Sequence, residues 1–199
     1  VATAEVGYPV SHPIPGWSEQ DPADWLAAFR SVIADLLDRA GPQMAQLRGI
    51  GVAGQMHGAT LLDRTGTVLR PCMLWNDTRS FEQAERLDAS PDFRDLSGNI
   101  VFPGFTAPKV QWVAENEPDV FNRIAKILLP KDYLGHWLTG FFASDMSDSA
   151  GTAWMDVGAR DWADTLLDQT GLSRDLMPDL YEGTQVVGSL RPELAVALD

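Results

Sequence analysis

The sequence is poor in cysteine, in basic clusters and in long apolar runs, and each shortage excludes a class of protein. Cys72 is the one cysteine among 199 residues, so neither an internal disulfide nor a Cys-rich zinc site can form. The net charge is −13 and no Lys/Arg cluster stands out, which argues against a nucleic-acid partner because phosphates would be repelled. No apolar run approaches the roughly 18 residues that span a bilayer, so we expect no membrane partner. From the single cysteine we expect reducing, cytoplasmic surroundings.

The start of the chain also lacks the marks of a secretory signal. Residues 1–5 contain neither a basic region nor an apolar core, which excludes a signal peptide. The first residue is valine instead of methionine. We therefore expect that processing or truncation has removed the start, and that the chain is a piece of something longer.

Several common catalytic fingerprints are missing as well. There is no G-x-S-x-G elbow and no Cys/His constellation for a nucleophilic triad. There is neither a Walker motif G-x-x-x-x-G-K-[ST] nor a G-x-G-x-x-G stretch, so nucleotide binding by either fingerprint is excluded within these residues. What remains is a neutral polar set of Gln, His, Asn, Trp and Thr, which suits a polyhydroxy ligand better than an anion or a metal.

Apolar periodicity and turn residues predict alternating helices and strands, which is typical of an α/β domain. Asp21 and Pro22 predict a helix start, with aspartate as N-cap and proline at the first helical position, and the helix should end at residues 41–42. Further helices are predicted near residues 79–87, 91–98, 106–117, 130–139 and 161–168. Strands are predicted at residues 1–6, 47–53, 126–129 and 185–190, and a hairpin at residues 61–69.

A polar stretch bracketed by glycines, GQMHGAT at residues 54–60, follows the predicted strand 47–53. Glycine permits positive φ and a close approach of the backbone to a ligand, and strand ends are usual places for sites in open α/β sheets. Gln55, Met56 and His57 are therefore candidate binding residues. A tight connection in which His57 caps a neighbouring backbone group explains the same pattern about equally well.

A second candidate wall of a site is the run Trp75, Asn76 and Asp77, which ends an apolar segment. An indole offers a flat apolar face with one donor, and this suits a pyranose or a polyol. The alternative is that Asn76 or Asp77 caps the helix that follows.

Carboxylates and hydroxyls crowd residues 141–152, where Asp145 and Asp148 lie among serines and a threonine. Asp, Ser and Gly favour turns, so a simple connection accounts for this composition. The functional alternative is a loop that faces an anion or a metal, and with Asp77 the two aspartates could serve a metal-dependent nuclease. The acidic net charge argues against that nuclease.

Five segments together resemble the FGGY carbohydrate kinase family, and its bacterial xylulose kinases in particular. They are GQMHGAT at residues 54–60, LWNDTR at 74–79, FPGFTAPK at 102–109, LLPKDYL at 128–134 and ASDMSDSAGT at 143–152. The segments occur in the family's order and spacing and cover nearly all of the chain.

The resemblance implies an α/β domain of the ribonuclease-H-like (actin-like ATPase) type, with a mixed sheet flanked by helices and incomplete at both ends. Residues 1–199 would form the N-terminal sugar-binding lobe, without the family's first hairpin and without its C-terminal nucleotide lobe. Losing the hairpin would expose a strand edge beside residues 1–6, which invites pairing into a homodimer.

The same resemblance implies that Met56 and His57 contact a sugar, with Gln55, Trp75, Asn76 and Asp77 in or beside the pocket wall. The activity it implies is phosphorylation of D-xylulose to D-xylulose 5-phosphate with ATP and Mg²⁺. The family's catalytic aspartate, its phosphate-handling turn and most of its ATP site have no counterpart in these 199 residues. We therefore expect no catalytic and no metal-binding residue in the chain, and no kinase activity of the chain alone.

Three alternatives stay open at this point. The chain could derive from another pentulose or polyol kinase of the family, because sequence does not separate sugars that differ by one hydroxyl. It could be a sugar-binding domain without catalysis. It could also be the metal-dependent nuclease considered above.

Overall fold

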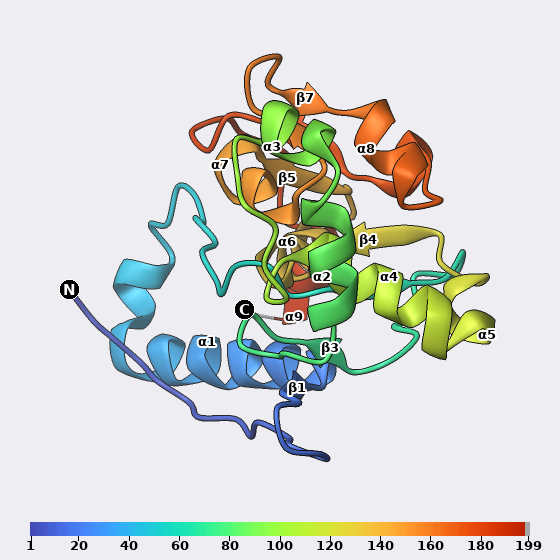
Figure 1. Ribbon diagram of the computed structural model, residues 1–199. Coiled ribbons are helices and arrows are strands. Elements are labelled where there is room, and N and C mark those ends of the chain that lie inside the picture. Colours follow the sequence, from blue (N-terminus) through green and yellow to red (C-terminus); the bar gives the residue numbers. More distant parts are fainter. Residues whose placement is uncertain (198–199) are drawn as a thin grey trace.

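The computed structural model describes the backbone of residues 1–197, in which helices and strands alternate, and the expected α/β class is confirmed (Figure 1). The helices are α1 (Pro22–Met44), α2 (Phe81–Asp88), α3 (Pro91–Ser97), α4 (Thr106–Asn116), α5 (Pro118–Phe121), α6 (Pro130–Thr139), α7 (Met146–Ser149), α8 (Asp164–Gln169) and α9 (Pro192–Ala197), with 3₁₀ turns η1 (Ala150–Thr152) and η2 (Arg174–Leu176). The strands are β1 (Glu19–Gln20), β2 (Thr60–Leu62), β3 (Cys72–Met73), β4 (Lys126–Leu128), β5 (Ala143–Asp145), β6 (Met155–Asp156), β7 (Asp161–Trp162) and β8 (Asp179–Tyr181).

Most helix boundaries follow the local signals, but the helix predicted at residues 161–168 begins only at Asp164, because Asp161 and Trp162 pair with β6 as strand β7. Asp21 caps α1, and its carboxylate accepts the backbone N–H of Ala23 at 2.9 Å. The predicted end of this helix at residues 41–42 is a kink at Ala40, after which the chain resumes one more helical turn. Gly140 ends α6 in the left-handed conformation with φ 83°, which a glycine adopts without steric cost.

The strands pair two by two instead of forming one mixed sheet within residues 1–197. Three pairs are antiparallel, β1 with β3, β2 with β4 and β6 with β7, and β5 pairs with β8 in parallel. The expected hairpin after β2 is present as a turn, because Asp63 accepts the N–H groups of Thr65 and Thr67 and the N–H of Leu69 returns to the carbonyl of Leu61.

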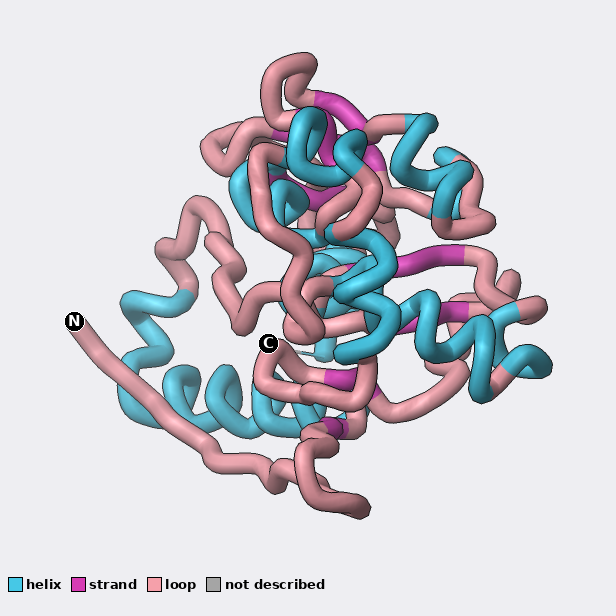
Figure 2. The backbone as a smooth tube through the Cα atoms, viewed as in Figure 1, coloured by secondary structure: helices cyan, strands magenta, loops and turns pink. Residues whose placement is uncertain are grey.

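Three predicted strands are wrong. Residues 1–6, 47–53 and 185–190 have no strand pairing, and Figure 2 shows them as loop. The physical reason is that a strand needs a ladder of hydrogen bonds from a neighbour, and the described residues offer none to these segments. Gly49 and Gly51 weaken the second run further, and its Leu47 and Ile50 are about half exposed.

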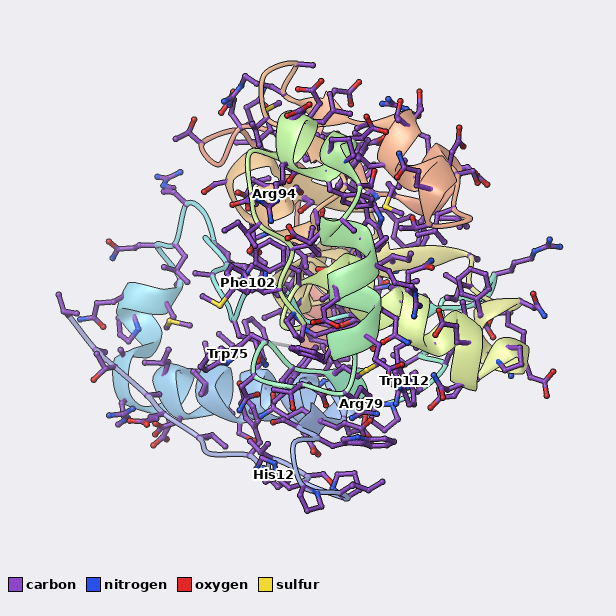
Figure 3. The ribbon with its side chains drawn as sticks, in the orientation of Figure 1. His12, Trp75, Arg79, Arg94, Phe102 and Trp112 are labelled. Atoms are coloured by element: carbon purple, nitrogen blue, oxygen red, sulfur yellow. The ribbon has the colours of Figure 1, made fainter. Side chains whose placement is uncertain are left out.

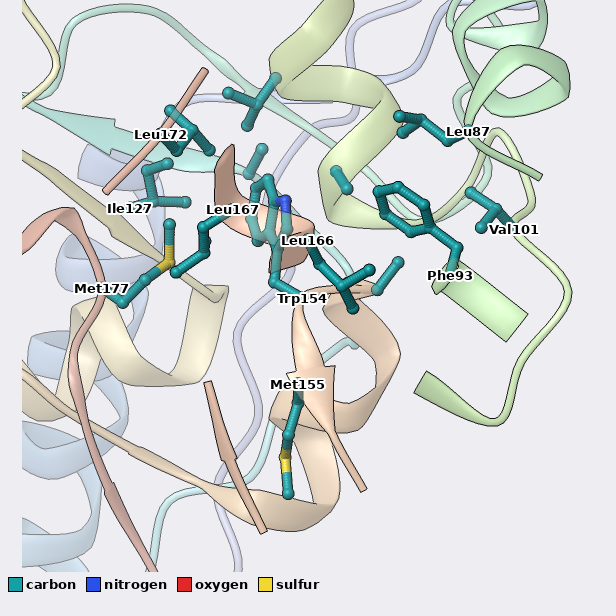
Figure 4. Close-up of a cluster of buried hydrophobic side chains, with 14 of the residues drawn as sticks. Leu87, Phe93, Val101, Ile127, Trp154, Met155, Leu166, Leu167, Leu172 and Met177 are labelled. Carbon is teal, nitrogen blue, oxygen red and sulfur yellow. The ribbon is translucent and has the colours of Figure 1, made fainter. Parts of the chain in front are cut away.

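The main hydrophobic core lies between the helices α2, α3, α4 and α8 and the strands β2, β4 and β6 (Figure 4). Trp154 is fully buried near its centre, and the indole N–H donates to the hydroxyl of Thr170 at 2.9 Å. Because this polar atom of the indole is paired, the ring fills the core without leaving a buried donor unsatisfied.

Helix α1 packs on α6 through aromatic pairs. The rings of Trp25 and Tyr133 meet edge to face with centroids 6.4 Å apart, and those of Phe29 and Trp137 do so at 5.8 Å. The N-terminal residues run along the outside of α1, where Arg39 donates to the carbonyl of Thr3 (Figure 1).

A buried ionic network fastens the segment before α1 to the body of the molecule. The side chain of Asp77 accepts two hydrogen bonds from the guanidinium of Arg79, at 2.9 and 2.6 Å, and one from the backbone N–H of Ser18 at 2.7 Å. Arg79 also pairs with Glu19 at 2.8 Å, and its guanidinium carbon lies 3.5 Å from the centre of the Trp17 ring. The alternative in which Asn76 or Asp77 caps the helix that follows is wrong, because Ser80 occupies the N-cap of α2.

We predict that Asp77→Ala lowers the free energy of unfolding by about 3 kcal/mol, because the buried Arg79 guanidinium keeps only Glu19 as a charged partner and the Ser18 N–H loses its acceptor. Urea denaturation measures the change. The matched control is Asp35→Ala, which breaks the half-exposed pair with Arg39 and should cost less than about 1 kcal/mol. Equal losses in the two variants would contradict a buried network that holds this segment.

Candidate functional site

His57 lies in a tight turn with a backbone conformation that is unusual for a residue with a side chain. Its φ is 64°, in the left-handed region, and the N–H of Gly58 returns to the carbonyl of Met56 at 2.8 Å. Such a conformation costs of order 1–3 kcal/mol and persists where the surroundings impose it. The next residue must be glycine, because a Cβ at Gly58 would come within 3.0 Å of the Pro130 and Cys72 side chains.

The imidazole of His57 is held on two sides by segments distant in the sequence. Its Nδ1 lies 2.7 Å from the carbonyl oxygen of Gly151, and its ring stacks on Phe105 with centroids 4.6 Å apart. Because a carbonyl only accepts hydrogen bonds, Nδ1 carries the proton. In the neutral ring Nε2 then has a free lone pair, so it can accept a hydrogen bond from a hydroxyl.

Electrostatics keep this ring neutral. Burial lowers the pKa of His57 below the ordinary value of 6.5, the Gly151 carbonyl partly opposes this shift, and the nearby Lys109 adds to it. Around pH 7 the ring is thus an acceptor at Nε2 and a donor at Nδ1.

The neighbours of His57 in the polar stretch differ in exposure. Met56 is 45% exposed and presents its thioether side chain to solvent. Gln55 is half-buried, and its amide donates to the side-chain oxygen of Gln20 at 2.8 Å, which also accepts the indole N–H of Trp25 at 3.0 Å. Gln55 is therefore tied to β1 and, through the shared Gln20 oxygen, to Trp25 of α1, whereas Met56 is free to meet a ligand.

Trp75 and Phe102 form an exposed aromatic surface at one edge of the body (Figure 3). Trp75 is 53% exposed and Phe102 54%, and Asn76 is exposed beside the indole. The two loops touch through their backbones, because a Cβ at Gly104 would overlap the carbonyl oxygen of Trp75. Phe102 packs edge to face on Phe105, at 5.9 Å between centroids, and this pair links the surface to the His57 ring.

Asp77 does not share this surface. Its side chain is fully buried and both of its oxygens are engaged by Arg79 and by the Ser18 N–H. This enclosed carboxylate supports the Trp75 loop from its buried side.

The acidic residues of the 141–152 segment surround a lysine. The ammonium of Lys131 pairs with Asp132, with Asp145 at 2.8 Å and with Asp148 at 3.3 Å. Burial opposes the charge of Lys131, but these carboxylates raise its pKa above the ordinary value. The carboxylate of Asp145 also accepts the N–H of Asp148 at 3.0 Å and caps α7.

This cluster does not fit a metal or a nucleotide phosphate. Lys131 neutralises part of the charge that a cation would need, and Asp77 belongs to a separate network with Arg79. Among residues 1–197, no three His, Cys, Asp or Glu side chains come together as metal ligands. The nuclease alternative therefore has no support in this geometry.

Together, these residues offer an apolar aromatic face, a thioether and one acceptor nitrogen. Sugars present C–H faces and hydroxyl groups, which such a combination can bind. No helix of the described part is long and apolar enough to cross a membrane.

Comparison with known proteins identifies the family. The model of the FGGY family of carbohydrate kinases, N-terminal domain, matches residues 1–198. The chain belongs to this family. It is 52% identical over 189 residues to a xylulose kinase of Escherichia coli strain K12, with 94% of the chain and 39% of that protein covered. It is 40% identical over 190 residues to a xylulose kinase of Bacillus subtilis strain 168, with 94% and 38% covered.

Solved structures of the FGGY family agree with this assignment. The crystal structure described as a xyloylose kinase from Brucella ovis superposes with a TM-score of 0.95 at 59% identity, covering 96% of the chain and 39% of that protein. A xylulose kinase from Rhodospirillum rubrum superposes with a TM-score of 0.88 at 31% identity, again with 96% and 39% covered. These likenesses confirm the actin-like fold class. The chain spans about two fifths of the length of the relatives that it matches.

Three residues that shape the site were missed by sequence reasoning. Phe105, Lys109 and Gly151 lie in segments recognised as family motifs, but no role was assigned to them. A signal existed for Lys109, because it lies four positions before the buried Val113 and therefore on the same side of α4. Phe105 and Gly151 gave no signal, because their roles depend on contacts with His57 over 48 and 94 positions.

We predict that Gly151→Ala displaces the His57 ring, because the added Cβ would lie closer than 3.0 Å to two ring atoms. Nδ1 then loses its carbonyl partner, and NMR of ¹⁵N-labelled histidine should show a mixture of the two neutral tautomers. Gly135→Ala is the matched control, since a Cβ there meets nothing within 4 Å and should slightly stabilise α6. An unchanged His57 spectrum in Gly151→Ala would refute the contact.

We also predict that His57 titrates below its ordinary pKa of 6.5, mainly because of burial. A base with a lowered pKa in the folded state takes up a proton on unfolding. Its contribution to stability is therefore present above the unfolded pKa and is lost as the pH falls through the folded one. Residue-resolved NMR titration between pH 8 and 4.5 measures the midpoint, and a midpoint at or above 6.5 contradicts the prediction.

Proposed function

We propose that this chain is the sugar-binding part of an ATP-dependent kinase that phosphorylates D-xylulose to D-xylulose 5-phosphate. The observation that carries the proposal is the 52% identity to a xylulose kinase over 94% of the chain, with the His57 turn and the Trp75 loop inside the matched region. The neutral imidazole supplies the means of recognition: a ketose hydroxyl donates its proton to Nε2 of His57.

The proposed site residues form two groups, one exposed enough to contact the sugar and one that positions the loops. Met56, His57, Trp75 and Asn76 meet the sugar, because each is exposed or half-exposed on the same pair of loops. Gln55 and Asp77 position these loops from behind, Gln55 through Gln20 and Asp77 through Arg79. Discrimination among pentuloses would then come from the direction of Nε2 and of the Asn76 amide.

ATP and Mg²⁺ belong to the proposal for the longer protein. The Lys131 cluster does not suit a metal, so we assign the nucleotide, the metal and the catalytic base to parts of the protein outside these residues. We also propose a cytoplasmic location and no nucleic-acid partner, which the single cysteine and the acidic composition support. The homodimer stays a prediction, and residues 1–6 supply no strand edge for it.

We predict that the chain alone binds D-xylulose but does not phosphorylate it with ATP and Mg²⁺, whereas the full-length protein does. Isothermal titration with D-xylulose, D-ribulose, xylitol and glycerol measures binding by both proteins, and ³¹P NMR follows the product. His57→Leu, which keeps the bulk without an acceptor, is the variant that should lose binding.

Turnover by the pure chain would overturn the assignment of base and nucleotide site to other parts of the protein. A preference of the full-length protein for another sugar on this panel would favour a different pentulose or polyol kinase. Sugar binding without turnover by the full-length protein would favour a binding domain without catalysis.

A further inference from the structure

Lys109 is the most deeply buried cation of the site region, and neither the proposed sugar contacts nor the ionic network uses it. It lies on α4, and its residue exposure is 0%. Lysine is almost never fully buried unless its amine is paired. No carboxylate lies within ion-pair distance of its Nζ among the described residues.

The partners of the Lys109 amine are two backbone carbonyls from the two loops of the site. Nζ donates to the carbonyl of His57 at 2.9 Å and to that of Gly104 at 2.6 Å. The first carbonyl belongs to the residue with positive φ, and the second to the loop that touches Trp75 and carries Phe102. The buried Lys109 side chain therefore joins the His57 turn to the loop that carries the exposed Phe102.

The protonation chemistry fits this arrangement. Burial lowers the pKa of Lys109 to about 7, with Asp77 opposing the shift and Arg79 adding to it. An amine in either protonation state has the two N–H groups that the two carbonyls require. The hydroxyl of Thr106 donates to the same His57 carbonyl at 3.2 Å, so this peptide group is held from two directions.

We propose that Lys109 is the positioning residue of the sugar site, which holds the His57 peptide in its left-handed conformation and thereby aims Nε2 at the ligand. The inference rests on the proposed sugar-binding role of His57. Without the amine, the His57 carbonyl loses its stronger donor. The turn then relaxes toward ordinary φ, and the ring leaves the Gly151 carbonyl.

The test compares Lys109→Met with Lys126→Met in the ¹⁵N-histidine-labelled chain. Lys126 is a matched control because its amine also joins two backbone carbonyls, those of Asp175 and Met177, at 2.6 and 3.0 Å. Both variants remove one such link and should lower the unfolding temperature. Only Lys109→Met should shift His57 from the Nδ1–H tautomer to a mixture, and it should weaken D-xylulose binding by roughly tenfold or more, the factor that about 1.4 kcal/mol represents.

Thr106→Val provides a second variant of nearly equal volume, which removes the weaker donor to the same carbonyl. It should move the His57 spectrum in the same direction by a smaller amount, and it decides the question if Lys109→Met does not fold. An unchanged tautomer in Lys109→Met, or in Thr106→Val where the first is unfolded, overturns the proposal.

The two readouts separate this proposal from the function on which it rests. If the unmodified chain and the full-length protein both fail to bind D-xylulose, the proposed function fails, while the tautomer measurement still decides whether Lys109 positions His57. If the sugar binds and Lys109→Met binds it as tightly as the unmodified protein, the positioning role is overturned and the function stands.

Discussion

The site depends on the backbone conformation at His57, whose one local hydrogen bond, from the Gly58 N–H to the Met56 carbonyl, is supplemented by contacts from distant segments. A residue with a side chain reaches this conformation at a cost, and here contacts from two distant segments, the start of α4 and the turn at Gly151, offset that cost. Gly151 accepts from the ring, Phe105 stacks on it, and Lys109 and Thr106 hold the carbonyl. The turn therefore depends on the packing of these segments around it.

In this site the polar and charged side chains that hold the loops are buried, and the exposed surface is mainly apolar. Lys109, Asp77 and Arg79 are buried and bonded to backbone or to one another, while Trp75, Phe102 and Met56 remain about half exposed. Removing one partner of a buried hydrogen bond or ion pair is strongly destabilising, so these interactions fix the positions of the groups that they join. Exposed aromatic and thioether side chains cost little to keep in place and gain when a ligand covers them. A polyhydroxy ligand therefore meets a surface whose shape is already set.

Sequence reasoning succeeded where the signal was local. The Asp21–Pro22 start of α1, the proline start of α6 and the glycine end of α6 all depend on residues within one helical turn. It failed where partners lie elsewhere: residues 47–53 have the composition of a strand, but a strand requires a neighbour, and among the described residues none pairs with this run. The same limit applies to Asp77, whose sequence context suggested a contact residue although Arg79 and Ser18 enclose it.

Lys109 and Lys126 make similar hydrogen bonds but connect different parts of the structure. Lys109 and Lys126 each join two backbone carbonyls, and both precede an apolar residue in the sequence, so neither pattern nor bond count distinguishes them. Their difference lies in which peptides they hold. Lys126 joins β4 to the η2 region, whereas Lys109 joins the turn that carries His57 to the loop that carries Phe102 and contacts Trp75. The hydrogen bonds of Lys126 stabilise the fold, whereas those of Lys109 set the direction of the acceptor nitrogen Nε2 of His57.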